Sequence, residues 1–136
     1  MERPIKALGE IALRVNDLDE MQRFYEEVIG LKLMRRFEKS AFFHIADGYA
    51  GHTQILALFD RSDRPGYAGV NAEHSTIDHI AFTIGLADYE TEKQRLHNLG
   101  MQVRTDEHAW VRWRSLYVKD PEGNSIELVC YDTSVD

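Results

Sequence analysis

The 136-residue sequence has little of what several common protein functions require. Its single cysteine, Cys130, cannot form an internal disulfide, and no Cys-x-x-Cys pair is present for zinc binding or redox chemistry. The sequence has no glycine-rich phosphate loop and no Gly-x-Ser-x-Gly turn. These absences count against nucleotide cofactors and serine hydrolase chemistry. The position of Cys130 in a strand-like segment indicates a packed core thiol.

Long apolar runs and an excess of positive charge are missing as well. No stretch approaches the roughly 20 apolar residues of a membrane span, and the first residues lack the apolar segment of a secretory signal. We therefore expect a cytoplasmic protein that does not bind membranes. The formal net charge is -7 and the arginines are scattered along the chain, so we expect no nucleic-acid partner.

What the sequence does contain is an internal repeat. The segments EIALRV (residues 10–15) and HIAFTI (residues 79–84) both open with a polar residue and then alternate, as a half-buried strand does. A helical pattern follows each segment and ends at a glycine, Gly30 or Gly100. Asp17, with Glu20 three residues later, is predicted to cap the first helix.

Three strand-like segments follow each predicted helix. They are residues 31–37, 41–46 and 53–59 in the first half, and residues 101–105, 113–119 and 125–131 in the second. The predicted fold class is α+β, with two tandem βαβββ modules whose mixed sheets curve around a common metal-binding cavity. We expect a single domain, residues 1–136, with modules at about 7–59 and 76–132 and a linker at about 60–75.

The repeat predicts which positions of the two modules are equivalent. Aligning residues 43–47 with 116–120 pairs His44 with Tyr117. Aligning residues 55–58 with 126–129 pairs Leu56 with Glu127.

Three polar side chains occupy strand positions where partners are needed. Strand alternation places Glu10 and His79 opposite the apolar side chains that pack on the helices. Glu127 lies within an otherwise apolar strand, and an ionised carboxylate there is costly unless it is paired. One imidazole and two carboxylates suit a divalent metal ion. From the residues alone, a buried ion pair between His79 and a carboxylate explains the pattern equally well.

These features together resemble the vicinal oxygen chelate superfamily. The resemblance rests on the repeated plan, on the two strand openings, on the segment FYEEVIGL and on DPEGNSIEL, and it runs from about residue 7 to 132. Glyoxalase I, extradiol dioxygenases, fosfomycin-resistance transferases, methylmalonyl-CoA epimerase and bleomycin-resistance proteins belong to this superfamily. The resemblance implies a small-molecule substrate, and it implies a homodimer, which the residues do not indicate.

The resemblance also implies a ligand set for one divalent metal ion, whether Fe(II), Mn, Zn or Ni. The matching positions are Glu10, His79 and Glu127. Several members take a further ligand from the last strand of the first module, where Leu56 stands. Leu56 cannot bind a metal, which leaves open whether Gln54 or His52 replaces it.

The leading interpretation is ring cleavage of a catechol-like, aromatic substrate by a dioxygenase. Tyr117 and His108 lie ten and 19 residues before Glu127, at offsets where similar extradiol enzymes carry a tyrosine and a histidine. Tyr117 would position the chelated oxygens, and His108 or His44 would carry a proton. Two extradiol ligands are usually histidines, however, and Glu10 replaces the first of them.

Two other functions stay open at this point. In a lyase or isomerase of the glyoxalase and epimerase type, Glu10 would remove a proton next to a carbonyl group. In a metal-free protein of the bleomycin-resistance type, the chain would only bind an aromatic compound. The presence of all three candidate ligands favours the enzymes.

Overall fold

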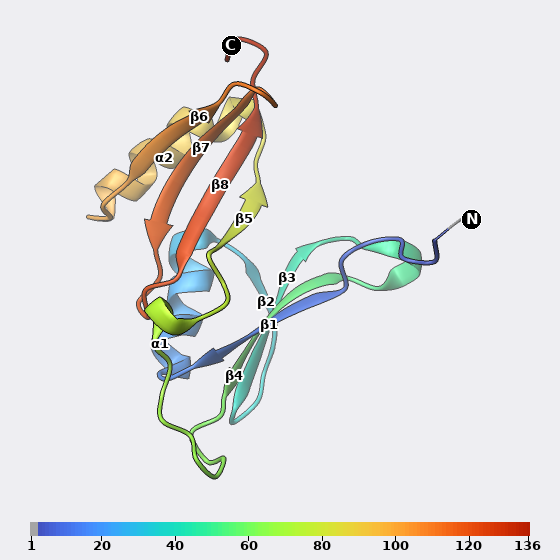
Figure 1. Ribbon diagram of the computed structural model, residues 1–136, viewed down its shortest axis with the longest axis vertical. Coiled ribbons are helices and arrows are strands. Elements are labelled where there is room, and N and C mark those ends of the chain that lie inside the picture. Colours follow the sequence, from blue (N-terminus) through green and yellow to red (C-terminus); the bar gives the residue numbers. More distant parts are fainter. Residues whose placement is uncertain (1–2) are drawn as a thin grey trace. The chain divides into compact units, whose positions relative to one another are not determined.

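The structure is a computed structural model and describes residues 3–136. It divides into two compact units, one ending at Val70 and the other beginning at Asn71 (Figure 1). Among the described residues, no helix is long and apolar enough to cross a lipid bilayer. The boundary falls inside the predicted linker, which is irregular apart from the short 3-10 turn η3(Ala72–His74).

The first unit, unit 1, is a four-stranded sheet with one helical segment. Its strands are β1(Glu10–Val15), β2(Lys32–Arg36), β3(Ser40–Ala46) and β4(Gln54–Asp60), with the short 3-10 turn η2(Tyr49–Gly51) before β4. The helical segment consists of α1(Leu18–Arg23) and a π-helical continuation, η1(Phe24–Ile29). The sheet order is β1-β4-β3-β2, and only β1 and β4 run parallel.

The second unit, unit 2, repeats this plan. Its strands are β5(His79–Thr83), β6(Arg104–His108), β7(Trp113–Lys119) and β8(Ser125–Tyr131). After β5 come the 3-10 turn η4(Leu86–Asp88) and the helix α2(Tyr89–Asn98), which runs along one face of the sheet (Figure 1). The order β5-β8-β7-β6, with β5 parallel to β8, matches unit 1. Two βαβββ modules in an α+β chain are therefore confirmed. The common cavity concerns how the units meet and stays a prediction.

The first helix begins and ends where local chemistry predicts. The Asp17 side chain accepts a hydrogen bond from the Glu20 backbone N–H at 3.1 Å, which satisfies one free donor of the first turn. Gly30 ends the helical segment with φ 89°, a left-handed conformation that glycine adopts without the steric cost of a Cβ.

Each sheet has one face that packs against its helix and another that does not; we call these the helix face and the open face. On the helix face of unit 2 lie Ile80, Phe82, Leu116, Ile126 and Leu128, all buried. Their alternation partners form the open face, and most are polar. They include His79 on β5, Arg104 and His108 on β6, Ser115, Tyr117 and Lys119 on β7, and Glu127 on β8.

Strand β6 lies three residues later than predicted, at Arg104–His108 instead of 101–105. The chain leaves α2 through Gly100, and the Met101 N–H still donates a hydrogen bond to the Leu96 carbonyl at 3.0 Å, as is common where a helix ends. Because β6 is an edge strand with mostly exposed polar residues, it has no apolar alternation to mark it. His108 consequently belongs to a strand.

Strand register corrects one predicted equivalence. In unit 2, Glu127 pairs with Ala81, which lies two residues after His79. The same step from Glu10 in unit 1 leads to Ala57 on β4. The predicted match of Leu56 with Glu127 is therefore wrong by one residue. A shift of one residue in a strand turns a side chain to the other face, and Leu56 is in fact fully buried on the helix face.

The predicted match of His44 with Tyr117 is wrong as well. Tyr117 pairs directly with Glu127, and the corresponding partner of Ala57 in unit 1 is Phe42. His44 pairs with Ile55, one step further along the open face. A bulge between His44 and Ala46 interrupts this pairing, and alternation in the sequence does not reveal such a bulge.

Candidate metal centre

Glu127 lies at the middle of the open face of unit 2 and is nearly inaccessible, with 5% of its surface exposed. Ser115, which is fully buried on the neighbouring strand β7, donates a hydrogen bond from Oγ to Glu127 Oε2 at 2.5 Å. A hydroxyl donor at this distance to a carboxylate is a strong, charge-assisted bond. One oxygen of Glu127 is therefore held by the protein, and Oε1 is left for another partner.

That partner is His79, at the start of β5. Its Nε2 lies 3.3 Å from Glu127 Oε1, and its Nδ1 lies 2.7 Å from Asp78 Oδ1. If Nδ1 carries the proton that bonds to Asp78, the neutral ring turns the lone pair of Nε2 toward a carboxylate oxygen. Two electron-rich atoms at this distance need a proton or a metal cation between them.

The distance between these two atoms fits a shared metal ion. Donor atoms about 2.1 Å from one ion are about 3.0 Å apart at a right angle and about 3.4 Å apart at the tetrahedral angle. The observed 3.3 Å lies in this range. The Asp78 contact is the carboxylate–histidine arrangement that orients metal-binding imidazoles. A protonated His79 paired with Glu127 fits the same distance, as the sequence also allowed.

His108 and Tyr117 lie beside this pair. The two side chains are hydrogen-bonded, with 3.2 Å between His108 Nε2 and the Tyr117 hydroxyl oxygen. His108 Nε2 is also 3.8 Å from Glu127 Oε2. Burial, and secondarily the negative charge of Glu127, raise the pKa of Tyr117 above its ordinary value. The phenol therefore remains protonated at neutral pH and can donate a hydrogen bond.

The remaining predicted site residues belong to unit 1. Glu10 is exposed at the first position of β1 and shares the open face of unit 1 with His44, since both pair with Ile55. His44 lies 3.4 Å from Asp47. In the described residues 3–136, no three His, Cys, Asp or Glu side chains gather so that they could hold a metal. The ligand set of Glu10, His79 and Glu127 stays a prediction.

The two proposed replacements for Leu56 are engaged elsewhere. The side-chain amide of Gln54 donates to the Asp47 carbonyl at 3.4 Å. The ring of His52 lies next to Gly9, and its Nδ1 is 2.8 Å from the Thr53 carbonyl oxygen. Both residues belong to unit 1, so their role as ligands stays a prediction.

Sequence reasoning missed three residues around the pair: Asp78, Ser115 and Arg104. Asp78 directly precedes His79, and its adjacency was the only signal in the sequence. Ser115 shares the face of Tyr117 by alternation, but its bond to Glu127 depends on the pairing of β7 with β8. Arg104 lies in the strand whose position was predicted wrongly, and its guanidinium stacks 4.0 Å from the centre of the Tyr117 ring.

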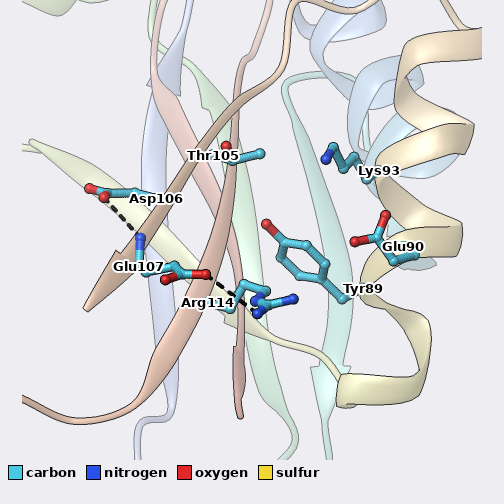
Figure 2. A pocket seen from close by; sticks show the side chains of 7 residues that line it. All are labelled: Tyr89, Glu90, Lys93, Thr105, Asp106, Glu107 and Arg114. Atoms are coloured by element: carbon cyan, nitrogen blue, oxygen red, sulfur yellow. Dashed lines mark hydrogen bonds and ion pairs between the residues drawn. The ribbon is translucent and has the colours of Figure 1, made fainter. Parts of the chain in front are cut away.

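A polar pocket of about 290 Å³ lies between α2 and strands β6 and β7 (Figure 2), and neither His79 nor Glu127 lines it. Figure 2 shows Arg114 beside Glu107, to which it is ion-paired at 3.4 Å. Tyr89, also in the pocket wall, donates from its hydroxyl to the Ser115 carbonyl at 3.1 Å. From the helix face, Tyr89 thus fixes the backbone of Ser115, whose side chain donates a hydrogen bond to Glu127.

Comparison with known families decides the relationship. Residues 7–128 match the family model described as the Glyoxalase/Bleomycin resistance protein/Dioxygenase superfamily. The chain belongs to this superfamily. The superfamily resemblance inferred from the repeat is thereby confirmed.

Two of the curated proteins that the chain resembles are named as transferases. The chain is 27% identical to glutathione transferase FosA of Serratia marcescens, over 91% of this chain and 80% of that protein. It is 29% identical to metallothiol transferase FosB of Bacillus licheniformis, over 91% of this chain and 75% of that protein.

A solved structure shares the fold. It is a variant of the fosfomycin resistance protein FosX of Listeria monocytogenes, solved with Mn(II) and a dihydroxypropylphosphonic acid. The TM-score is 0.69 at 21% identity, over 96% of this chain and 95% of that one.

Proposed function

We propose that this superfamily member is a divalent-metal-dependent enzyme that binds two neighbouring oxygens of a small molecule. The observation that carries the proposal is the 3.3 Å approach of His79 Nε2 to Glu127 Oε1 on a face where Asp78 and Ser115 orient both side chains. His79 and Glu127 would hold the ion, with Glu10 as the third ligand. Once bound, the ion would act as a Lewis acid that polarises the substrate oxygens.

Glu10 lies in the other unit, so its contribution has two possible sources. It would come from the same chain or from the second chain of a homodimer. Mixing Glu10→Ala with Glu127→Ala protein separates the two arrangements. A site shared between chains would regain metal binding in the mixed dimer, because one of its two sites would be intact, whereas a site within one chain would not.

Within the superfamily, we propose transfer of a thiol to a small electrophile. Likeness to FosA and FosB over 91% of the chain supports this reaction. Opening an epoxide with a thiol forms a C–S bond and breaks a C–O bond, so one proton leaves sulfur and one reaches oxygen. His108 is placed to accept the first proton. Tyr117, protonated because its pKa is raised, is placed to hydrogen-bond the oxygen.

Ring-cleaving oxygenation is the second candidate function. The hydrogen bond between His108 and Tyr117, with both side chains next to Glu127, matches the arrangement expected of an extradiol enzyme. Glu10 in place of a histidine counts against it. Among the enzyme functions considered, the aromatic substrate expected from the sequence belongs to this candidate.

Elemental analysis of the purified protein tests the metal. We expect about one ion per centre, lost in Glu10→Ala, His79→Ala and Glu127→Ala but kept in the matched controls Glu38→Ala and His97→Ala, which alter exposed residues outside the centre. Protein without stoichiometric metal after reconstitution would remove all three enzyme functions, namely thiol transfer, ring cleavage and the lyase or isomerase reaction, and leave a binding protein. Full metal content in all three ligand variants would refute the ligand assignment.

The reaction is tested on metal-loaded protein with separate readouts. Loss of free thiol with glutathione and an epoxide such as fosfomycin would support transfer. Oxygen uptake with catechols would support ring cleavage instead. Solvent deuterium exchange into a ketone or thioester, without either change, would support the lyase or isomerase interpretation.

A further inference from the structure

Two cations share the open face of unit 2 with the His79–Glu127 pair. Arg104 on β6 pairs directly with Tyr117, which pairs with Glu127, so these three residues form one row across the sheet. Lys119 lies two residues after Tyr117 on the same strand and pairs with Ser125, which pairs with His79. Each cation thus lies in a cross-strand row with one candidate metal ligand: Arg104 with Glu127, and Lys119 with His79.

Arg104 and Lys119 are diagonal neighbours across the β6–β7 pair. Such positions have Cβ atoms about 7 Å apart on one face of an antiparallel sheet, within reach of long side chains. A guanidinium and an ammonium group on these stems can therefore contact the same small ligand. Between them lies Tyr117, whose ring supports the Arg104 guanidinium at 4.0 Å.

The donors of both cations are available to a ligand. The Arg104 side chain is 67% exposed and makes no hydrogen bond to the described residues; besides its stacking on Tyr117, its one carboxylate neighbour among them is Asp106, at 4.0 Å. Lys119 is exposed and donates one bond, from Nζ to Ser125 Oγ at 2.7 Å, to a neutral acceptor. Two of its three N–H donors are then free. In a chain of net charge -7, this places two incompletely neutralised cations beside the candidate centre.

We propose that Arg104 and Lys119 form an oxyanion subsite, which binds a carboxylate, phosphonate or phosphate group of the substrate next to its chelated oxygens. The guanidinium would bind two oxygens of a phosphonate or phosphate and the ammonium the third, whereas the two oxygens of a carboxylate would be shared between the two cations. The role of the group as part of a substrate rests on the proposed function, but anion binding itself does not. A neutral catechol would leave the subsite empty.

Anion binding is measured first on metal-free full-length protein, by titration with inorganic phosphate, methylphosphonate and acetate at low ionic strength. We expect saturable binding of at least one anion by the wild type. This affinity should fall at least tenfold in Arg104→Gln/Lys119→Gln. It should fall at least threefold in Arg104→Lys, which keeps the charge but loses the paired N–H donors of the guanidinium. The order of affinities separates a carboxylate from a phosphonate or phosphate substrate. Circular dichroism confirms folding, and Arg104→Lys serves if the double variant misfolds.

The matched control is Arg112→Gln/Lys93→Gln, which removes the same charge from unit 2 outside the open face. Arg112 is in the β6–β7 turn, and Lys93 lines the pocket on the α2 side. We expect the control to bind anions within twofold of wild type. No saturable binding to wild type, equal binding in all variants, or a loss confined to the control would overturn the subsite.

A second measurement places the anion relative to the metal. With Mn(II) bound, the phosphorus resonance of methylphosphonate should relax faster in wild type, and this effect should vanish in the Arg104/Lys119 double variant. Glu127→Gln should lose Mn(II) while still binding the anion. Failure of Mn(II) binding would thus count against the proposed function, and failure of anion binding against the subsite.

Discussion

Replacing Ser115 by alanine tests how the protein prepares Glu127 for a metal. The change removes one hydroxyl group and leaves the rest of the packing in place. Glu127 Oε2 then loses the donor at 2.5 Å in a site where only 5% of the residue is exposed to water. Hydrogen bonds to charged groups contribute about 1.5–3 kcal/mol, and we expect the free energy of unfolding of the metal-free protein to fall by about this amount.

The same change should weaken metal binding. Loss of a residue that orients a metal ligand typically lowers affinity about 10- to 100-fold, and we expect Mn(II) affinity to fall in this range. Urea unfolding measures the first effect, and Mn(II) titration followed by electron paramagnetic resonance measures the second. Ser125→Ala is the control, because Ser125 lies on the same face but contacts Lys119 instead of Glu127. Unchanged stability and unchanged Mn(II) affinity in Ser115→Ala would refute the role of this hydrogen bond.

Three further outcomes follow from the structure. In urea unfolding, Tyr89→Phe should lower the free energy of unfolding by about 1 kcal/mol, because the Ser115 carbonyl loses its buried donor. An unchanged free energy would contradict a stabilising role for this hydrogen bond. Because the pKa values of Tyr89 and Tyr117 are raised, the folded protein keeps these two protons to higher pH than the unfolded chain does. The free energy of unfolding should therefore be retained below pH about 10 and fall above it. This fall at alkaline pH should be smaller in Tyr117→Phe. Burial raises the pKa of Cys130, so a thiol reagent at pH 8 should react slowly in native protein and fast in urea; rapid native reaction would argue against a core thiol.

Much of the fold could be predicted because its signals are local. Strands β1, β7 and β8 occupy the predicted residues 10–15, 113–119 and 125–131 without a shift. Strand β1 alternates between buried and less buried side chains, whereas β8 is a mostly apolar segment, buried on both faces, that directly follows the turn residues DPEGN. Gly30 and the Asp17 cap mark helix ends that depend only on neighbouring residues. Strand β6 was misplaced because an exposed edge strand needs no apolar alternation.

The candidate site could be predicted only in part. Alternation shows that Tyr117 and Glu127 turn to the face opposite their buried neighbours, and the structure agrees. Alternation does not show which residue of the next strand lies alongside, and the repeat alignment therefore matched Leu56 with Glu127 instead of Ala57. Cross-strand register arises from hydrogen bonding and packing over the whole sheet, including bulges that shift it.

The amino-acid sequence by itself determined the duplicated module, the limits of most elements and the face on which each polar side chain lies, because these follow from the periods of strands and helices. Only the tertiary structure decided that Glu127 is held by Ser115, faces His79 and lies in one row with Tyr117 and Arg104. These contacts join residues that are distant in the chain, and the pairing of whole strands brings them within reach of one another.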